Sequence, residues 1–155
     1  MDHKPNVLFL CTGNSARSQM AEGLLRHRAG DQYNALSAGT SPKTLNPLAV
    51  QVMNEIGIDI SQQRSKDLVE FLGKVAIPHL VVVCGNAAET CPRVWPGVMT
   101  REFWNLDDPA AATGSEEVRL DVFRESRDEI DRRIRNWLRD HHADAAFSQA
   151  DATQR

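Results

Sequence analysis

The chain has 155 residues, which is the size of one domain and is long enough to bury a substantial core. Its formal net charge of −3 argues against nucleic-acid binding, and no apolar run approaches the ~20 residues of a membrane helix. The first residues lack the apolar stretch of a signal peptide, so we expect a cytoplasmic protein without nucleic-acid or membrane partners. Three cysteines are too few for a disulfide scaffold and are more typical of catalysis or metal binding.

Short apolar runs alternate with segments of helical periodicity along most of the chain. Apolar runs bounded by turn residues are typical of buried strands, whereas apolar residues three and four positions apart are typical of helices. In chain order, the predicted elements are a strand at 6–10, a helix around 20–25 that ends at Gly30, a strand at 33–37, a helix at 46–57, a short helix at 68–75, strands at 79–84 and 98–104, and a long helix around 123–138. The small and polar residues 143–155 are expected to form a flexible tail.

This alternation predicts a single α/β domain over residues 1–142, with three layers: a parallel sheet between helices on both faces. Ligands bind such sheets at the carboxyl ends of the strands. Cys11 and Cys84 each follow a predicted strand directly or complete one. The spacing therefore places two thiols at the same edge of the sheet.

The sharpest motif is a cysteine followed after five residues by an arginine, from Cys11 to Arg17, between a strand and a helix. A loop that curls into a helix start directs its backbone N–H groups at one bound oxyanion. Gly13 and Asn14 tolerate backbone angles that other residues resist. Arg17 supplies a two-pronged donor, and the positive potential should keep the Cys11 sulfur as a thiolate, to which the Ser18 hydroxyl can donate. The predicted oxyanion-binding residues are Thr12, Gly13, Asn14, Ser15, Ala16 and Arg17.

Residues 7–22, together with 37–39 and 107–109, resemble the low-molecular-weight protein tyrosine phosphatase superfamily, and within it the thioredoxin-coupled arsenate reductases. The resemblance runs from about residue 6 to residue 140. It implies a four-stranded parallel sheet of order 2-1-3-4, Cys11 as the nucleophile and Asp108 as the general acid. It also implies reduction of arsenate to arsenite without a bound cofactor or metal, with phosphate or sulfate as competing oxyanions. The sequence does not show the oligomeric state, for which a monomer is our default expectation.

The second and third cysteines, Cys84 and Cys91, are seven positions apart. On a helix this spacing corresponds to about 10.5 Å of rise, whereas a disulfide needs Cα atoms within about 7 Å. Forming the bond therefore requires the segment to unwind. The resemblance implies that Cys11, Cys84 and Cys91 pass a disulfide outward in turn, and that thioredoxin or a similar thiol carrier reduces it.

A phosphatase acting on phosphotyrosine or small phosphomonoesters is the main alternative, because it needs only Cys11, Arg17 and Asp108. Phosphatases of the family follow the Asp-Pro pair with aromatic residues, whereas this chain has alanines at 110–112, which weakens that alternative. A structural zinc site is a second alternative, but no CxxC spacing supports it.

Lys66 marks a further departure from the family. Some relatives bind potassium behind the loop, through residues that match Asn14, Glu22 and Ser37 and through an aspartate near this position. We hypothesise that the Lys66 ammonium takes the place of that cation and supports the loop.

Overall fold

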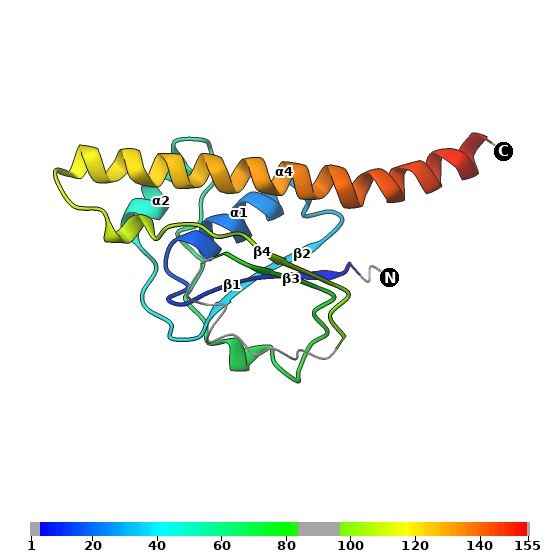
Figure 1. The fold of residues 1–155 in the computed structure, drawn as a ribbon, viewed down its shortest axis with the longest axis horizontal. Helices are drawn as coiled ribbons and strands as arrows, with labels where there is room; N and C mark the ends of the chain where they lie inside the picture. The colour runs from blue at the N-terminus through cyan, green and yellow to red at the C-terminus, as the bar shows by residue number, and fades with distance from the viewer. Residues whose placement is uncertain (1–3, 84–96, 155) are drawn as a thin grey trace.

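The computed structural model describes residues 4–83 and 97–154 (Figure 1). Its elements, in chain order, are β1 (Asn6–Cys11), α1 (Arg17–Ala29), β2 (Asn34–Gly39), α2 (Pro47–Asn54), the 3-10 turn η1 (Leu68–Glu70), β3 (His79–Val82), β4 (Thr100–Phe103), the 3-10 turn η2 (Pro109–Ala111) and α4 (Glu116–Gln154). The four strands form one parallel sheet of order β2-β1-β3-β4. The predicted α/β class and strand order are therefore confirmed.

Strand β1 lies in the middle of the sheet and is buried from Val7 to Cys11. Its uninterrupted apolar sequence suits a strand that is covered on both faces. The register pairs Cys11 with Gly39 of β2 and Leu10 with Val82 of β3. Because the strands are parallel, their carboxyl ends meet at one edge, where Cys11 lies.

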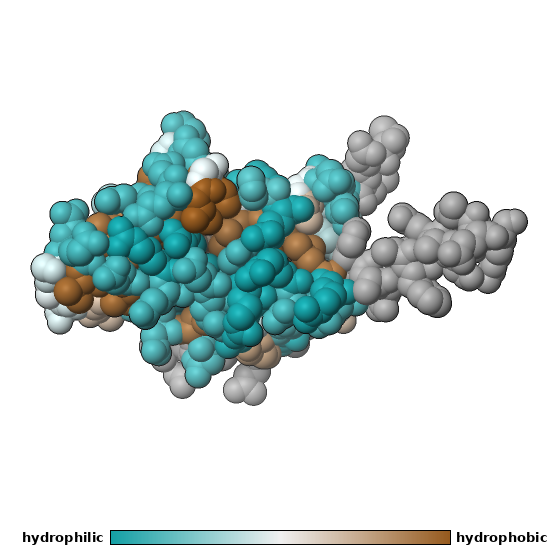
Figure 2. Space-filling view, turned by 90° about the horizontal axis from the view of Figure 1, so that it is seen from above, coloured by the Kyte–Doolittle hydropathy of each residue, from teal (hydrophilic) through white to brown (hydrophobic). Residues whose placement is uncertain are grey.

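In the described part of the chain, α1, α2 and α4 lie on one side of the sheet, and η1 lies on the other (Figure 1). Helix α4 packs against α1 and α2 through one apolar stripe, in which Phe123, Ile130 and Ile134 are almost completely buried. Its outward face is mainly hydrophilic (Figure 2). Ion pairs with Glu55 from Arg124 and Arg127 tie this helix to the end of α2.

Two predicted segments differ from the structure in the kind of secondary structure they form. Residues 68–75, predicted as a short helix, contain only the 3-10 turn η1, capped by the Asp67 side chain. A left-handed Gly73, with φ of 76°, follows within this segment, and a helix cannot continue through that conformation. Helix α4 runs to Gln154, through most of the residues expected to form a tail, so their backbone is helical. Their flexibility stays a prediction. Among the described residues, no helix is long and apolar enough to cross a membrane.

Ile130→Ala tests whether the α4 stripe holds the layers together. Ile130 is fully buried, so the substitution should lower the free energy of unfolding, measured by urea denaturation, by about 2–5 kcal/mol. Val118→Ala on the same helix is the matched control, because Val118 is 51% exposed and its loss should cost little. Equal losses in the two variants would contradict this account of the packing.

Candidate active site

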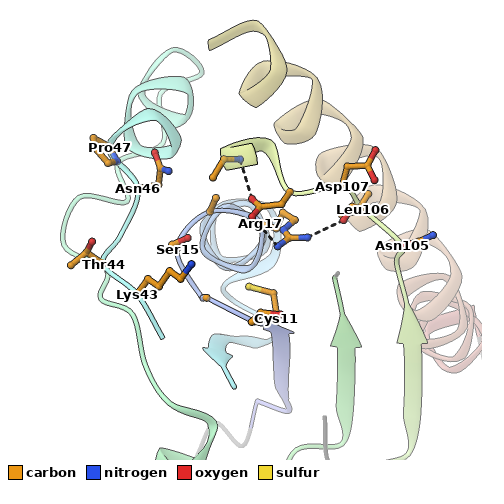
Figure 3. Close-up of a pocket in the computed structure, with 15 residues that line it drawn as sticks. Cys11, Ser15, Arg17, Lys43, Thr44, Asn46, Pro47, Asn105, Leu106 and Asp107 are labelled. Carbon is orange, nitrogen blue, oxygen red and sulfur yellow. Dashed lines mark hydrogen bonds and ion pairs between the residues drawn. The ribbon is translucent and has the colours of Figure 1, made fainter. Parts of the chain in front are cut away.

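A cavity of about 540 Å³ opens where β1 ends and α1 begins (Figure 3). It is lined by Cys11, Thr12, Gly13, Ser15, Ala16, Arg17, Lys43, Thr44, Asn46, Pro47, Asn105, Leu106, Asp107, Asp108 and Ala110. Most of the predicted oxyanion loop thus lies on the wall of one cavity. The Cys11 side chain is buried beside it, at 2% exposure.

The carbonyl oxygens of the loop all accept hydrogen bonds from outside the loop. The bonds run from Thr40 N to Cys11 O (3.2 Å), from Ser41 N to Thr12 O (2.8 Å), from Lys43 N to Gly13 O (2.8 Å), from Ser65 Oγ to Asn14 O (2.7 Å) and from Asn46 N to Ser15 O (2.9 Å). In a trans peptide the N–H group points opposite to the carbonyl group. The N–H groups of residues 12–16 are therefore directed inward, and that of Asn14 donates to Cys11 Sγ at 3.2 Å.

Helix α1 adds to this inward field because its first turn is uncapped. Its N-cap residue, Ala16, provides no side-chain hydrogen bond, and the first turn contains no acidic residue. The free N–H groups and the positive end of the helix dipole are thus left for a ligand. Such a ring of donors fits a tetrahedral oxyanion.

A series of hydrogen bonds determines that the Ser18 hydroxyl is a donor to the Cys11 sulfur. The Lys66 backbone N–H can only donate, and it donates to Asn14 Oδ1 at 2.8 Å, which sets the orientation of that amide. Asn14 Nδ2 then donates to Ser18 Oγ at 2.7 Å. Since the Ser18 oxygen already accepts this bond, its own hydrogen is available for Cys11 Sγ, 2.9 Å away. A hydroxyl donor directed at sulfur stabilises a thiolate.

The strained position in the loop is Asn14, with φ of 45°, the one non-glycine residue with positive φ in the described part of the chain. Gly13 was also expected to use unusual backbone angles, but it does not adopt positive φ. A Cβ atom at Gly13 would meet Ser15 Oγ at 3.5 Å and the Lys43 stem at 3.7 Å, which are ordinary van der Waals distances. The asparagine tolerates αL because its short polar side chain bonds locally.

Arg17 lies at the cavity mouth, on the side of Leu106 and Asp108. Its Nη1 donates to the Leu106 carbonyl at 3.0 Å, and its Nη2 lies 3.7 Å from Asp108 Oδ2. Arg17 is 10% exposed at its side chain and Asp108 is 47% exposed, so the carboxylate faces the opening. Asp108 is extended, as the following Pro109 demands, and its Oδ1 caps η2 by accepting from Ala110 N.

Behind the loop, two of the predicted supporting residues, Ser37 and Lys66, converge on the carboxylate of a third, Glu22. Glu22 is buried; Ser37 Oγ donates to its Oε1 at 2.5 Å, and Lys66 Nζ lies 3.5 Å from the same oxygen. Arg26 pairs with the other oxygen, and Lys66 Nζ also donates to the Arg64 carbonyl at 2.7 Å. Burial lowers the pKa of Lys66, while the charge of Glu22 opposes that shift.

Cys84 and Cys91 lie outside the described residues. Val83, which directly precedes Cys84, donates its N–H to the Leu10 carbonyl at 2.9 Å. The chain therefore leaves β3 beside the residue that precedes Cys11. Within residues 4–83 and 97–154, no group of three or more potential metal ligands is close enough to hold a metal ion.

Sequence reasoning missed the segment 40–46, the Lys43 side chain and the Leu106 carbonyl. The segment and Leu106 contribute through backbone atoms, and the type of a residue does not indicate which hydrogen bonds its backbone makes. A basic residue near the helix cap Asn46 was a visible signal for Lys43, but only the fold brings it to the cavity.

Gly39→Ala tests the dependence of the loop on its support. A Cβ atom at Gly39 would lie 2.5 Å from the Thr12 carbonyl and 3.0 Å from the Asn14 nitrogen, so the loop must shift. We expect phosphate binding, measured by calorimetry, to be lost, and the free energy of unfolding to fall by about 1–3 kcal/mol.

Gly57→Ala is the control for that loss of stability. Gly57 has φ of 81° and open space around it. Backbone strain in the variant should therefore lower the free energy of unfolding by about 1–2 kcal/mol while the loop stays intact. It should bind phosphate normally. Normal phosphate binding by Gly39→Ala would refute the proposed support.

Comparison with known proteins assigns the family. The chain matches the family model described as low molecular weight phosphotyrosine protein phosphatase over residues 6–147. The arsenate reductase of Shouchella clausii (strain KSM-K16) is 48% identical over 134 residues, which cover 86% of this chain and 95% of that protein. A solved arsenate reductase in the phosphate binding state is similar with a TM-score of 0.74 and 31% identity, covering 86% of this chain and 96% of that one.

The thioredoxin-dependent arsenate reductase of Corynebacterium glutamicum is similar with a TM-score of 0.68 and 28% identity, covering 91% of this chain and 63% of that one. The family match spans both the loop at residues 11–17 and Asp108. On fold, motif and sequence alike, the chain belongs to the low molecular weight phosphotyrosine protein phosphatase family.

Proposed function

We propose that this protein is an arsenate reductase that converts arsenate to arsenite through Cys11, Cys84 and Cys91, with a thioredoxin-like dithiol as its reductant. The observation that carries the proposal is the buried Cys11 sulfur, which receives a backbone N–H and a hydroxyl inside a ring of inward-directed amides. A relative named arsenate reductase with 48% identity supports the choice of substrate.

In the first step, the loop and Arg17 bind arsenate as a tetrahedral dianion. The Cys11 thiolate attacks arsenic and forms a sulfur–arsenic bond, while Asp108 protonates the departing oxygen, which leaves as water. The half-exposed Asp108 side chain suits this role in its protonated form, because it lies at the cavity mouth, where it can take up a proton from water before it donates. The inward N–H groups stabilise the charge that develops on the arsenate oxygens.

In the second step, Cys84 attacks the Cys11 sulfur, and the electron pair of the sulfur–arsenic bond stays on arsenic, which leaves as arsenite. Cys91 then attacks Cys84, which frees Cys11 and leaves a Cys84–Cys91 disulfide. A thioredoxin-like dithiol reduces that bond and becomes a disulfide itself, so two electrons pass from the carrier to arsenic in each cycle. The bond between Val83 and Leu10 favours the first exchange, because Cys84 is the next residue in the chain.

The proposal needs no bound cofactor or metal, since the thiols carry both electrons. It suits a reducing cytoplasm, where thiols persist, and a monomer suffices because every named group comes from one chain. Residual phosphatase activity is expected as well, because attack by Cys11 and proton donation by Asp108 are shared with phosphate ester hydrolysis.

We further propose that Lys66 replaces a potassium ion behind the loop. Its ammonium lies beside the buried Glu22 carboxylate, and its backbone N–H holds Asn14. A buried carboxylate needs a positive partner, and a fixed ammonium supplies one without a bound ion.

The three single Cys→Ser variants test the relay. Cys11→Ser should abolish turnover while phosphate still binds, Cys84→Ser should abolish arsenate-dependent oxidation of thioredoxin, and Cys91→Ser should allow about one turnover per chain before it stalls. The readout is thioredoxin oxidation in steady state and arsenite release in a single turnover. Hydrolysis of a phosphomonoester should survive in Cys84→Ser and Cys91→Ser. Multiple turnovers in Cys91→Ser would rule out the relay order.

Potassium dependence tests the role of Lys66. In the unaltered protein, potassium chloride should give the same melting temperature and turnover as sodium chloride at equal concentration. Lys66→Ala should lose about 1–3 kcal/mol of stability, because Glu22 loses one charged partner, and should become more stable in potassium than in sodium. Stabilisation of the unaltered protein by potassium over sodium is the outcome that excludes the hypothesis.

A further inference from the structure

We propose that Lys43 is the second cation of the oxyanion site and sets its affinity for doubly charged ions. It lines the same cavity as Cys11 and Arg17, and its side chain extends toward the loop (Figure 3). The inference deepens the proposed function and rests on it in one respect: the ligand is taken to be a free tetrahedral dianion.

Both the backbone and the side-chain stem of Lys43 contact the loop. Its backbone N–H donates to the Gly13 carbonyl at 2.8 Å, so its Cα atom cannot move independently of the loop. Its stem runs over the bare backbone of Gly13, where Cγ and Cδ would lie 3.8 and 3.7 Å from an added Cβ atom. These are ordinary van der Waals distances, so the lysine stem lies directly along the backbone of the loop.

The charges around the cavity favour a second cation at the site. Two acidic side chains, Asp107 and Asp108, line the cavity, and the Cys11 thiolate of the proposed mechanism adds further negative charge. Arg17 is the other cationic residue in the described lining, and it already donates to Leu106 and pairs with Asp108. Lys43 adds one positive charge to this lining, so a dianion that enters the site meets a less negative set of side chains than it would without the lysine.

The Lys43 ammonium is available for that ion. In the described part of the chain it makes no hydrogen bond and no ion pair, and the residue is exposed at the cavity. Arg17 is anchored at the opposite side, next to Asp108 (Figure 3). Two cations on different sides can hold separate oxygens of one tetrahedral ion, whereas a singly charged ion gains less from the second.

Lys43→Met tests the proposal, because methionine keeps most of the stem and removes the charge. Phosphate affinity is measured by calorimetry in a Cys11→Ser parent, in which no turnover occurs. Arsenate kinetics are measured with Cys11 intact. We expect phosphate affinity to fall and the KM for arsenate to rise, each by about tenfold, with kcat changed less than about twofold.

Lys43→Arg should restore both values to within about threefold, since it restores the charge. Lys74→Met is the matched control: it removes one exposed lysine away from the cavity, changes the net charge equally and should leave both values unchanged. The loss in Lys43→Met should shrink at high ionic strength, because a charge interaction is screened.

The outcomes separate this inference from the proposed function. Unchanged phosphate affinity and KM in Lys43→Met, or equal losses in Lys74→Met, overturn the role of Lys43 while arsenate reduction stands. Absent arsenate turnover in the unaltered protein, together with weaker phosphate binding in Lys43→Met, overturns the proposed function and leaves the role of Lys43 intact.

Discussion

The site depends on a constraint that acts away from the ligand: every carbonyl oxygen of residues 11–15 is bonded outward. A short loop has as many acceptors as donors, and a free carbonyl turned inward would repel an anion. The segment 40–46 and Ser65 occupy the outer side and thereby hold the amides inward. The inward direction of the amides is thus set by backbone bonds that need no ligand, and a site arranged in advance avoids reorganisation during a reaction.

Asn14 connects this loop to the support behind it. Its αL conformation turns the chain, and its carbonyl accepts a hydrogen bond from Ser65 Oγ. Its side-chain amide is oriented by the Lys66 backbone N–H and in turn donates to Ser18 Oγ. One residue therefore sets the shape of the loop and the hydrogen-bond donor that meets the sulfur. No other side chain has the same combination of a short amide and tolerance of positive φ.

Local chemistry explains which features could be predicted from sequence. The first strand, the loop and α1 follow from an apolar run, turn formers and helical periodicity, and the strand order followed from family resemblance. The predicted helix at 68–75 was wrong because apolar spacing does not report a left-handed glycine such as Gly73. The outward bonds from 40–46 involve backbone atoms, which no residue type encodes, and Lys43 reaches the cavity only through them.

Asn46 belongs to two structures at once. Its N–H holds the Ser15 carbonyl, and its side chain caps α2 by accepting from Leu48 N. Near the other end of α2, Arg127 of α4 donates a hydrogen bond to the Val52 carbonyl at 2.7 Å. Hydrogen bonds therefore connect the long C-terminal helix, through α2 and Asn46, to the Ser15 carbonyl at the edge of the loop. A change in how that helix packs would alter the position of the loop.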